Sequence, residues 1–186
     1  PSDGAPTVNR LLDTLALYGI SVILAVAFYY QFVLGELPCP LCALQRVGFL
    51  VAGVALILNL RIGRAPTHYG LVLLTAVAAG SASLRQIALH VVPGSGSYGS
   101  ALFGLHFYTW AFVGYGALIV YVGAMLLVGG KVADAARPRP LGPFEIGACA
   151  LFVGLAAVNV IAFLLECGLG PCPDDPTGYL WLHSAR

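Results

Sequence analysis

Long apolar runs alternate along this chain with short polar connections that are rich in glycine and proline. Runs of roughly 20 apolar residues are long enough to cross a bilayer, and only helices and closed barrels can cross it with every backbone polar group satisfied. Runs this continuous favour helices. The pattern therefore predicts an all-α fold, a polytopic membrane helical bundle forming a single domain over residues 1–186, with spans at 12–34, 43–60, 69–92, 105–129 and 144–165.

The amino-acid composition supports a membrane location. Of 186 residues, 59% are hydrophobic and only 9% are charged, whereas soluble domains have about a quarter charged residues. A soluble fold needs such residues to cover its outside and is therefore excluded. The net charge is +1, without a basic stripe of interleaved aromatic residues, so no nucleic acid partner is expected. We expect the first apolar segment to remain as an anchor, because no small-residue cleavage site follows a short apolar core.

Basic residues are divided unequally between the two sets of connections. One set holds Arg10, Arg61, Arg64, Lys131, Arg137 and Arg139, whereas the other set and the tail 166–186 hold only Arg186. Lys and Arg in short loops favour the cytoplasmic side of a membrane. The N-terminus is therefore expected in the cytoplasm and the C-terminus on the opposite side. The tail and the connection before the second span both contain cysteines, which would then face the compartment where disulfides form and persist.

A C-x-x-C motif, Cys39-Pro40-Leu41-Cys42, lies at the start of the second span. This spacing is typical of a redox dithiol or of half a zinc site. A helix N-terminus and a nearby cation both favour the reactive thiolate. Arg46 lies one turn after Cys42 on the same helix face and can supply that cation. An arginine within a span is costly and is a functional candidate; the alternative is that it extends to the lipid headgroups.

A second cysteine pair, Cys167 and Cys172, follows the fifth span in a turn-rich segment. This pair can form a redox disulfide, a structural disulfide that closes the tail, or the second half of a zinc site. Permanent zinc binding would remove the thiols from redox use, and we predict no metal. Cys149 has no partner by spacing and is expected to behave as a small hydrophobic residue.

Several segments together match the pattern of a known family. The specific one is Pro38-Cys39-Pro40-Leu41-Cys42-Ala43-Leu44-Gln45-Arg46; supporting ones are Tyr30-Gln31-Phe32, Leu84-Arg85-Gln86-Ile87 with His90 and Pro93, and YGSALFGLHFYTW at 98–110. These segments resemble the DsbB family, bacterial inner-membrane quinone reductases that generate disulfides. The resemblance covers roughly residues 12–129, the first four spans.

The resemblance implies a fold, a cofactor and a partner. The fold is a four-helix core, to which this chain adds a fifth transmembrane helix. The C-x-x-C would be oxidised by ubiquinone or menaquinone bound near Arg46, and a thiolate, expected at Cys42, would contact the quinone. Electrons would come from a periplasmic, thioredoxin-like thiol oxidase of the DsbA type. These are expectations for a quinone-dependent thiol oxidase of the bacterial inner membrane, with its C-terminus in the periplasm.

Polar side chains near the outer ends of the spans are candidates for holding the quinone headgroup. They are Gln31, Arg85, Gln86 and His90. A quinone needs hydrogen-bond donors at its carbonyl oxygens within an otherwise apolar pocket. The alternative role for each is hydrogen bonding between helices.

The sequence departs from the family pattern in one respect. Members commonly have a second cysteine pair between the third and fourth spans, but residues 93–100 contain no cysteine. We hypothesise that Cys167 and Cys172 substitute for that pair, which makes the chain a divergent member. Two other interpretations remain open: a disulfide reductase that runs in the opposite direction, since reduction potentials decide the direction, and a non-catalytic accessory subunit of a membrane complex.

Overall fold

The computed structural model describes residues 8–92, 94–128, 140–174 and 176–183. Pro93, Lys131, Arg137, Arg139 and Arg186, which entered the sequence argument, lie outside these residues.

Six helices and one short hairpin make up the described chain. The long helices are α1 (Val8–Phe32), α2 (Pro40–Ile62), α3 (Pro66–His90), α4 (Phe107–Val128) and α5 (Pro143–Cys167). The hairpin β1 (Ala101–Leu102) and β2 (Leu105–His106) precedes α4, and the short α6 (Leu180–His183) follows α5. Among the described residues, five helices are long and apolar enough to cross a membrane. The predicted all-α polytopic membrane bundle is confirmed.

The predicted helix starts differ from the observed ones by up to four residues, as at α1, which begins at Val8 rather than residue 12. Helix α2 begins at Pro40 rather than residue 43, because Cys39 is its N-cap and proline suits the first helical position. Helix α4 begins at Phe107 rather than residue 105, because Leu105 and His106 pair with β1. The sequence gives little signal for a hairpin whose strands have only two residues each.

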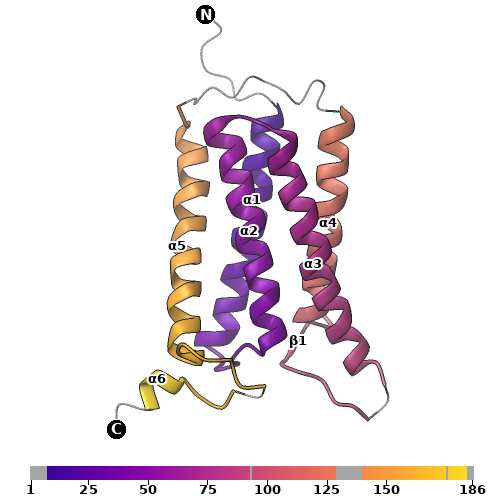
Figure 1. Cartoon of the computed structure of the whole chain (residues 1–186), viewed down its shortest axis with the longest axis vertical. Helices are drawn as coiled ribbons and strands as arrows, with labels where there is room; N and C mark the ends of the chain where they lie inside the picture. Colours follow the sequence, from indigo (N-terminus) through magenta and orange to yellow (C-terminus); the bar gives the residue numbers. More distant parts are fainter. Residues whose placement is uncertain (1–7, 93, 129–139, 175, 184–186) are drawn as a thin grey trace, which may run out of the picture.

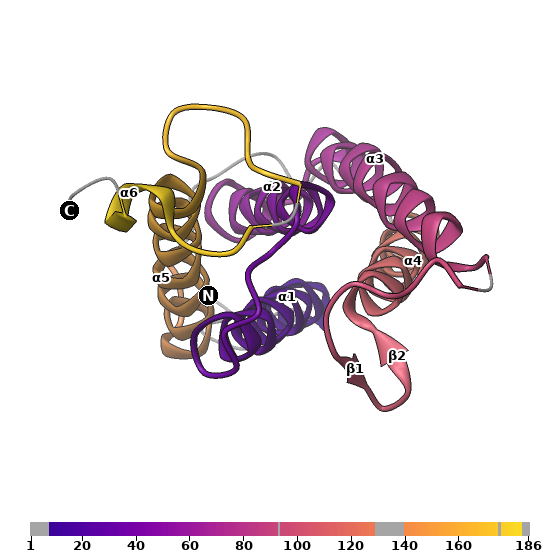
Figure 2. The same cartoon turned by 90° about the horizontal axis from the view of Figure 1, so that it is seen from below.

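The five long helices run alongside one another, with α1 and α2 in the middle of the bundle (Figures 1 and 2). Helices α3 and α4 lie on one side of this central pair, and α5 lies on the other. We call the end with both cysteine pairs, the hairpin and α6 the cysteine end, which is the lower end in Figure 1. The opposite end, with Arg10, Arg61 and Arg64, is the basic end.

Small residues allow α2 and α3 to pack closely. A Cβ atom placed on Gly48 would lie 2.4 Å from Cβ of Ala79 and equally close to the hydroxyl of Tyr115. Ala52 and Ala76 are fully buried in the same core. Membrane helices associate through van der Waals contact, which improves as their backbones approach. This contact holds α2, and the C-x-x-C at its start, against α3.

Helix α5 contacts the central helices α1 and α2 at two levels of the bundle. Near mid-height, the ring of buried Phe152 occupies the space above Gly53 of α2, where a Cβ would lie 2.2 Å from the ring. At the basic end, Arg10 of α1 forms an ion pair with Glu145 at 2.6 Å. Further buried residues of α5 extend to Glu166 and Cys167, so the helix packs against the bundle along most of its length.

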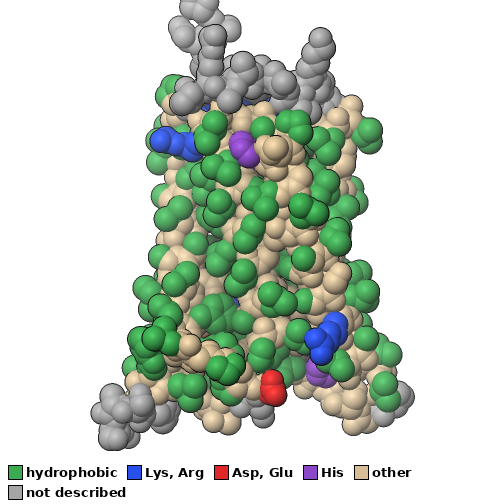
Figure 3. All heavy atoms as spheres, viewed as in Figure 1, with side chains coloured by type: hydrophobic (Ala, Val, Ile, Leu, Met, Phe, Trp, Pro, Cys, Tyr) green, Lys and Arg blue, Asp and Glu red, His purple; other side chains and the backbone are tan. Residues whose placement is uncertain are grey.

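The face of the bundle shown in Figure 3 is mostly apolar between its two ends, and its charged and histidine side chains lie near those ends. Side chains such as Leu74 and Val120 are more than 70% exposed. The interior in turn holds polar groups with partners: fully buried Asp13 accepts hydrogen bonds from the hydroxyls of Tyr69 and Tyr121. Apolar groups outside and paired polar groups inside are what a protein dissolved in lipid requires.

We predict that Gly48→Ala lowers the stability of the bundle, because the added methyl group forces α2 away from Ala79. Overpacking of this kind costs about 1–3 kcal/mol. The thermal unfolding midpoint in detergent measures the effect. Gly116→Ala on α4 is the matched control, since a Cβ there meets nothing within 4 Å. A Gly48→Ala midpoint equal to that of the control contradicts the prediction.

Candidate functional site

The first turn of α2 holds the C-x-x-C at the cysteine end. Cys39 is the N-cap residue, and its Sγ accepts a hydrogen bond from the backbone N–H of Cys42 at 3.1 Å. Pro40 follows at a position where a backbone N–H would have no partner in the helix. Cys39 and Cys42 form a disulfide, with Cα atoms 4.9 Å apart. Their sulfurs therefore lie at the positive end of a helix dipole, which favours the thiolate after reduction.

A buried glutamine from α3 lies against both sulfurs of this disulfide. Nε2 of Gln86 is 3.3 Å from Sγ of Cys39 and 3.6 Å from Sγ of Cys42. Its Oε1 accepts a hydrogen bond of 2.8 Å from Nε2 of Gln45, which fixes the amide so that its N–H groups point at the sulfurs. Gln86 and Gln45 are both buried. The pair thus provides a fixed donor for a sulfur that becomes negative.

Arg46 lies in the second turn of α2 and points toward α1. It donates to Oε1 of Gln31 and, at 3.3 Å, to the backbone oxygen of Ala27. Its guanidinium also lies 5.4 Å from the centre of the Phe28 ring, within range of a cation–π interaction. These contacts use two of the five N–H groups of a guanidinium. They hold the guanidinium against α1.

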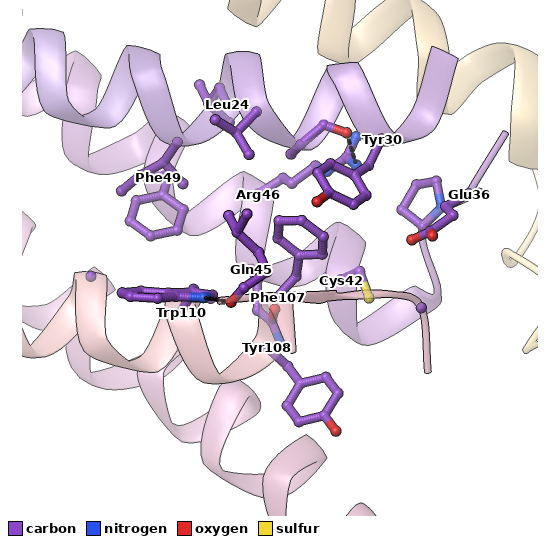
Figure 4. Close-up of a pocket in the computed structure, with 18 of the residues that line it drawn as sticks. Leu24, Tyr30, Glu36, Cys42, Gln45, Arg46, Phe49, Phe107, Tyr108 and Trp110 are labelled. Atoms are coloured by element: carbon purple, nitrogen blue, oxygen red, sulfur yellow. Dashed lines mark hydrogen bonds between the residues drawn. The ribbon is translucent and has the colours of Figure 1, made fainter. Parts of the chain in front are cut away.

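A cavity of about 310 Å³ lies between α1, α2 and α4, next to the disulfide. Its wall is mainly aliphatic and aromatic, with Tyr30, Phe49, Phe107 and Trp110 among its side chains (Figure 4). Cys42, Gln45 and Arg46 from α2 line it as well. The site therefore combines an apolar volume with a redox sulfur, an amide and a permanent positive charge.

The loop before α4 covers the cavity at the cysteine end. Tyr98 and Leu102 line the cavity, and the Tyr98 hydroxyl donates to the backbone oxygen of Leu37 at 2.7 Å. The carboxylate of Glu36 accepts from the backbone N–H of Ser100 at 3.1 Å. The loop is thus fastened to the connection between α1 and α2, which leads into the C-x-x-C.

The four remaining candidate residues lie in different places around the site. Gln31 contacts Arg46 from outside the cavity lining, and Gln86 contacts the disulfide. His90 bonds the backbone oxygen of Gln86 at 2.8 Å and stacks on Tyr108. Arg85 is exposed, since neighbouring residues on a helix point about 100° apart and Gln86 takes the inward position. These four residues are not among those that line the cavity.

Sequence reasoning missed three residues at this site. Gln45 was noted only as part of the motif, although its spacing places it on the face toward α3. Tyr179, whose hydroxyl accepts a 3.3 Å hydrogen bond from Gln31, reaches the site because the tail folds back under the bundle (Figure 2). Glu166 at the end of α5 is buried close to Arg46. Only Gln45 had a usable signal, because the other two depend on how α5 and the tail pack.

The second cysteine pair also forms a disulfide, between Cys167 at the end of α5 and Cys172 in the tail. Gly168 ends the helix with a φ of 64°, a conformation that favours glycine. Cys167 is buried and Cys172 is half-buried. Cys149 is free. Among the described residues, no three His, Cys, Asp or Glu side chains gather as a metal-binding set.

Comparisons with known proteins match the part of the chain that contains the C-x-x-C. The model of the family described as "Disulfide bond formation protein DsbB" matches residues 9–98. Over these residues the chain belongs to the DsbB family. The match includes α1, α2 and α3 with Cys39, Cys42, Arg46 and Gln86, and it ends before α4. The predicted resemblance from residue 98 to 129 stays a prediction.

Curated relatives cover the same region. A "Disulfide bond formation protein B" from Marinobacter nauticus is 45% identical over 89 residues, 46% of this chain and 53% of the relative. Relatives with the same description from Stutzerimonas stutzeri and Chromobacterium violaceum are 41% identical over 90 residues and 38% identical over 94 residues. These matches cover 45% and 48% of this chain and 54% and 57% of the respective relatives. The chain thus spans about half the length of the DsbB-family relatives it matches, and no solved structure matches it significantly.

We predict that the reduced protein loses thiol reactivity at Cys42 when the Gln86 amide is removed. Gln86→Met deletes the N–H donor beside the sulfurs, and Gln86→Glu replaces it with a negative oxygen, which disfavours the thiolate more strongly. We expect iodoacetamide to alkylate Cys42 about threefold and tenfold more slowly, respectively, at fixed pH. Mass spectrometry of the Cys42 peptide gives the rate.

Leu84→Ala on the exposed face of α3 is the control for this comparison and should alkylate at the wild-type rate. A wild-type rate for Gln86→Glu would mean that the amide has no influence on the sulfur.

Proposed function

We propose that this protein is a quinone-dependent thiol oxidase that generates disulfides and passes the electrons to a membrane quinone. The observation that supports this most directly is the position of Cys42 and Arg46 in the wall of one apolar cavity. A membrane enzyme that transfers electrons from thiols to a lipid-dissolved acceptor needs these three elements in contact. Membership of residues 9–98 in a family described by disulfide bond formation supports the same reaction.

The cavity fits ubiquinone or menaquinone by its chemistry. Its wall is mostly apolar, as a quinone ring and tail require, and Arg46 keeps three N–H groups beyond those bound to Gln31 and Ala27. We propose that Arg46 holds a quinone oxygen and that Gln45 and Cys42 border the ring. When bound, a quinone accepts two electrons and two protons and leaves as the quinol, which is the balance that reforming a disulfide requires.

Thiol chemistry at the cysteines proceeds through mixed disulfides. A thiolate of the reduced dithiol that donates the electrons attacks one sulfur of the Cys39–Cys42 disulfide, and the S–S bond breaks as the mixed disulfide forms. The second thiolate of the donor then attacks the donor sulfur in that mixed disulfide. The donor leaves as a disulfide, and Cys39 and Cys42 are left reduced by two electrons. The helix N-terminus, Gln86 and Arg46 stabilise the resulting thiolate, which we assign to Cys42 because its sulfur borders the cavity.

We further propose that Cys167 and Cys172 receive electrons first and pass them to Cys39 and Cys42. Both disulfides lie at the cysteine end, and the tail that contains Cys172 also contains Tyr179, which bonds Gln31 beside Arg46. The tail therefore connects the two pairs physically. In this proposal the Cys167–Cys172 pair replaces the loop pair that residues 93–100 lack.

The proposed location is the bacterial inner membrane, with the cysteine end in the periplasm. Arg10, Arg61 and Arg64 at the opposite end support a cytoplasmic basic end. The proposed electron donor is a soluble periplasmic thiol oxidase of the thioredoxin-like, DsbA type. Disulfides at this end would then face the compartment where they persist.

A direct test follows the absorbance of a short-chain quinone analogue during incubation of the purified protein with a reduced DsbA-type donor. We expect wild type to reduce the quinone and Cys39→Ser to show only background rates, because no intramolecular disulfide can form. Arg46→Ala should raise the KM for quinone about tenfold or more, since a hydrogen bond from a charged donor contributes about 1.5–3 kcal/mol.

Two outcomes of this assay would contradict the proposal. If wild type does not reduce the quinone, an accessory role becomes the better interpretation. If quinol instead drives reduction of an oxidised donor, the protein is a reductase.

The role of the second pair is tested by the variant Cys167→Ser/Cys172→Ser in the same assay. We expect oxidation of the protein donor to fall at least about tenfold, whereas oxidation of dithiothreitol, which can reach Cys39–Cys42 without a relay, should remain near the wild-type rate. A variant that oxidises the protein donor at the full rate would mean that the disulfide only holds the tail in place.

A further inference from the structure

Glu166 is a buried acid at the cysteine end of α5. It lies in the last turn of α5 and is 1% exposed. Neither carboxylate oxygen has a hydrogen bond within the described part of the chain. Placing a carboxylate inside a bundle costs several kcal/mol unless a charge or donor compensates it. A carboxyl group at such a position is held either as the neutral acid or as a carboxylate near a positive charge.

Arg46 can supply that positive charge. It is the one charged group within electrostatic range of Glu166 among the described residues, and the two side chains do not form a close ion pair there. Arg46 in turn borders the cavity beside Cys42. The charge of Glu166 thus reaches the redox site through the arginine, although Glu166 is not part of the cavity wall.

We propose that Glu166 is the buried counter-charge of Arg46 and that it adjusts the redox equilibrium of the Cys39–Cys42 disulfide. This inference rests on the redox role proposed above for that disulfide. Glu166 is a positioning residue in this scheme, because it acts through Arg46 and the field around Cys42. It also gives α5 a part in the chemistry besides delivering Cys167 and Cys172.

The face of α5 that contacts the bundle supports this role. Glu145, Phe152, Asn159 and Glu166 recur every seven residues and are all buried. Residues seven apart lie on nearly the same side of a helix. The two acids at the ends of this stripe each lie near an arginine of the central helices: Glu145 binds Arg10 of α1, and Glu166 interacts with Arg46 of α2. Helix α5 thus places one acidic side chain at each end of the bundle.

The sign of the effect follows from the charges. Arg46 stabilises a Cys42 thiolate and therefore favours the reduced form of the pair. The negative charge of Glu166 opposes this attraction. Removing it leaves the positive charge of Arg46 uncompensated, so the reduced form becomes more stable and the disulfide more oxidising. A loss of packing without a change in charge is not expected to favour the reduced form of the Cys39–Cys42 pair.

The test equilibrates purified full-length protein with dithiothreitol buffers and measures Cys39–Cys42 by differential alkylation and mass spectrometry. In Glu166→Gln, the equilibrium constant for reduction should rise about three- to tenfold; tenfold corresponds to about 30 mV for a two-electron couple. Glu166→Asp keeps the charge and should restore the wild-type value. Glu145→Gln removes the acid at the far end of the same face, about 30 Å away, and should not change it.

An unchanged equilibrium in Glu166→Gln, or a shift toward the oxidised form, overturns the proposal. If Glu166→Gln folds poorly, the variant Arg46→Gln/Glu166→Gln decides instead: for a charge pair, the double variant unfolds at a higher temperature than either single one. A double variant no more stable than both singles also overturns it. The assay needs neither quinone nor protein donor, so a failure of the proposed function is seen separately as absent quinone reduction.

Discussion

A single positive charge inside an apolar bundle determines how the cysteine end is built. Arg46 cannot lose its proton under ordinary conditions, and a permanent charge in a medium of low dielectric constant must be surrounded by groups of opposite polarity. Helix α1 supplies the Gln31 amide oxygen, the Ala27 carbonyl oxygen and the face of the Phe28 ring. Helix α5 supplies the Glu166 carboxylate. Groups from α1 and α5 therefore surround one charged side chain of α2.

The spans and the chemical centre of the protein could be predicted from the sequence because both depend on local pattern. Apolar runs identify membrane helices, and a C-x-x-C followed one turn later by arginine places sulfur and charge on one helix face. The side of α3 that faces the bundle could not be predicted so well. Arg85 and Gln86 are adjacent and both were candidates, but packing turns Gln86 inward and leaves Arg85 exposed.

Contacts made by the end of the chain were beyond sequence reasoning for a different reason. Tyr179 and Glu166 reach the Arg46 region only after α5 has packed against α1 and α2 and the tail has folded back. Such contacts join residues more than a hundred positions apart, and local periodicity contains no information about them. The interval of seven residues between Glu145, Phe152, Asn159 and Glu166 on α5 was visible in the sequence. The helices that this face of α5 contacts were not.

The hydrogen bond from the Cys42 backbone to the Cys39 sulfur has a kinetic consequence. A sulfur that serves as the N-cap can accept this bond both within a disulfide and as a free thiol or thiolate, and Pro40 removes a second N–H that would otherwise need a partner. The first turn of α2 can therefore keep one backbone conformation through the whole redox cycle. Electron transfer in either direction then requires little reorganisation of the chain, and the rate depends on the approach of the reactants rather than on refolding of the helix start.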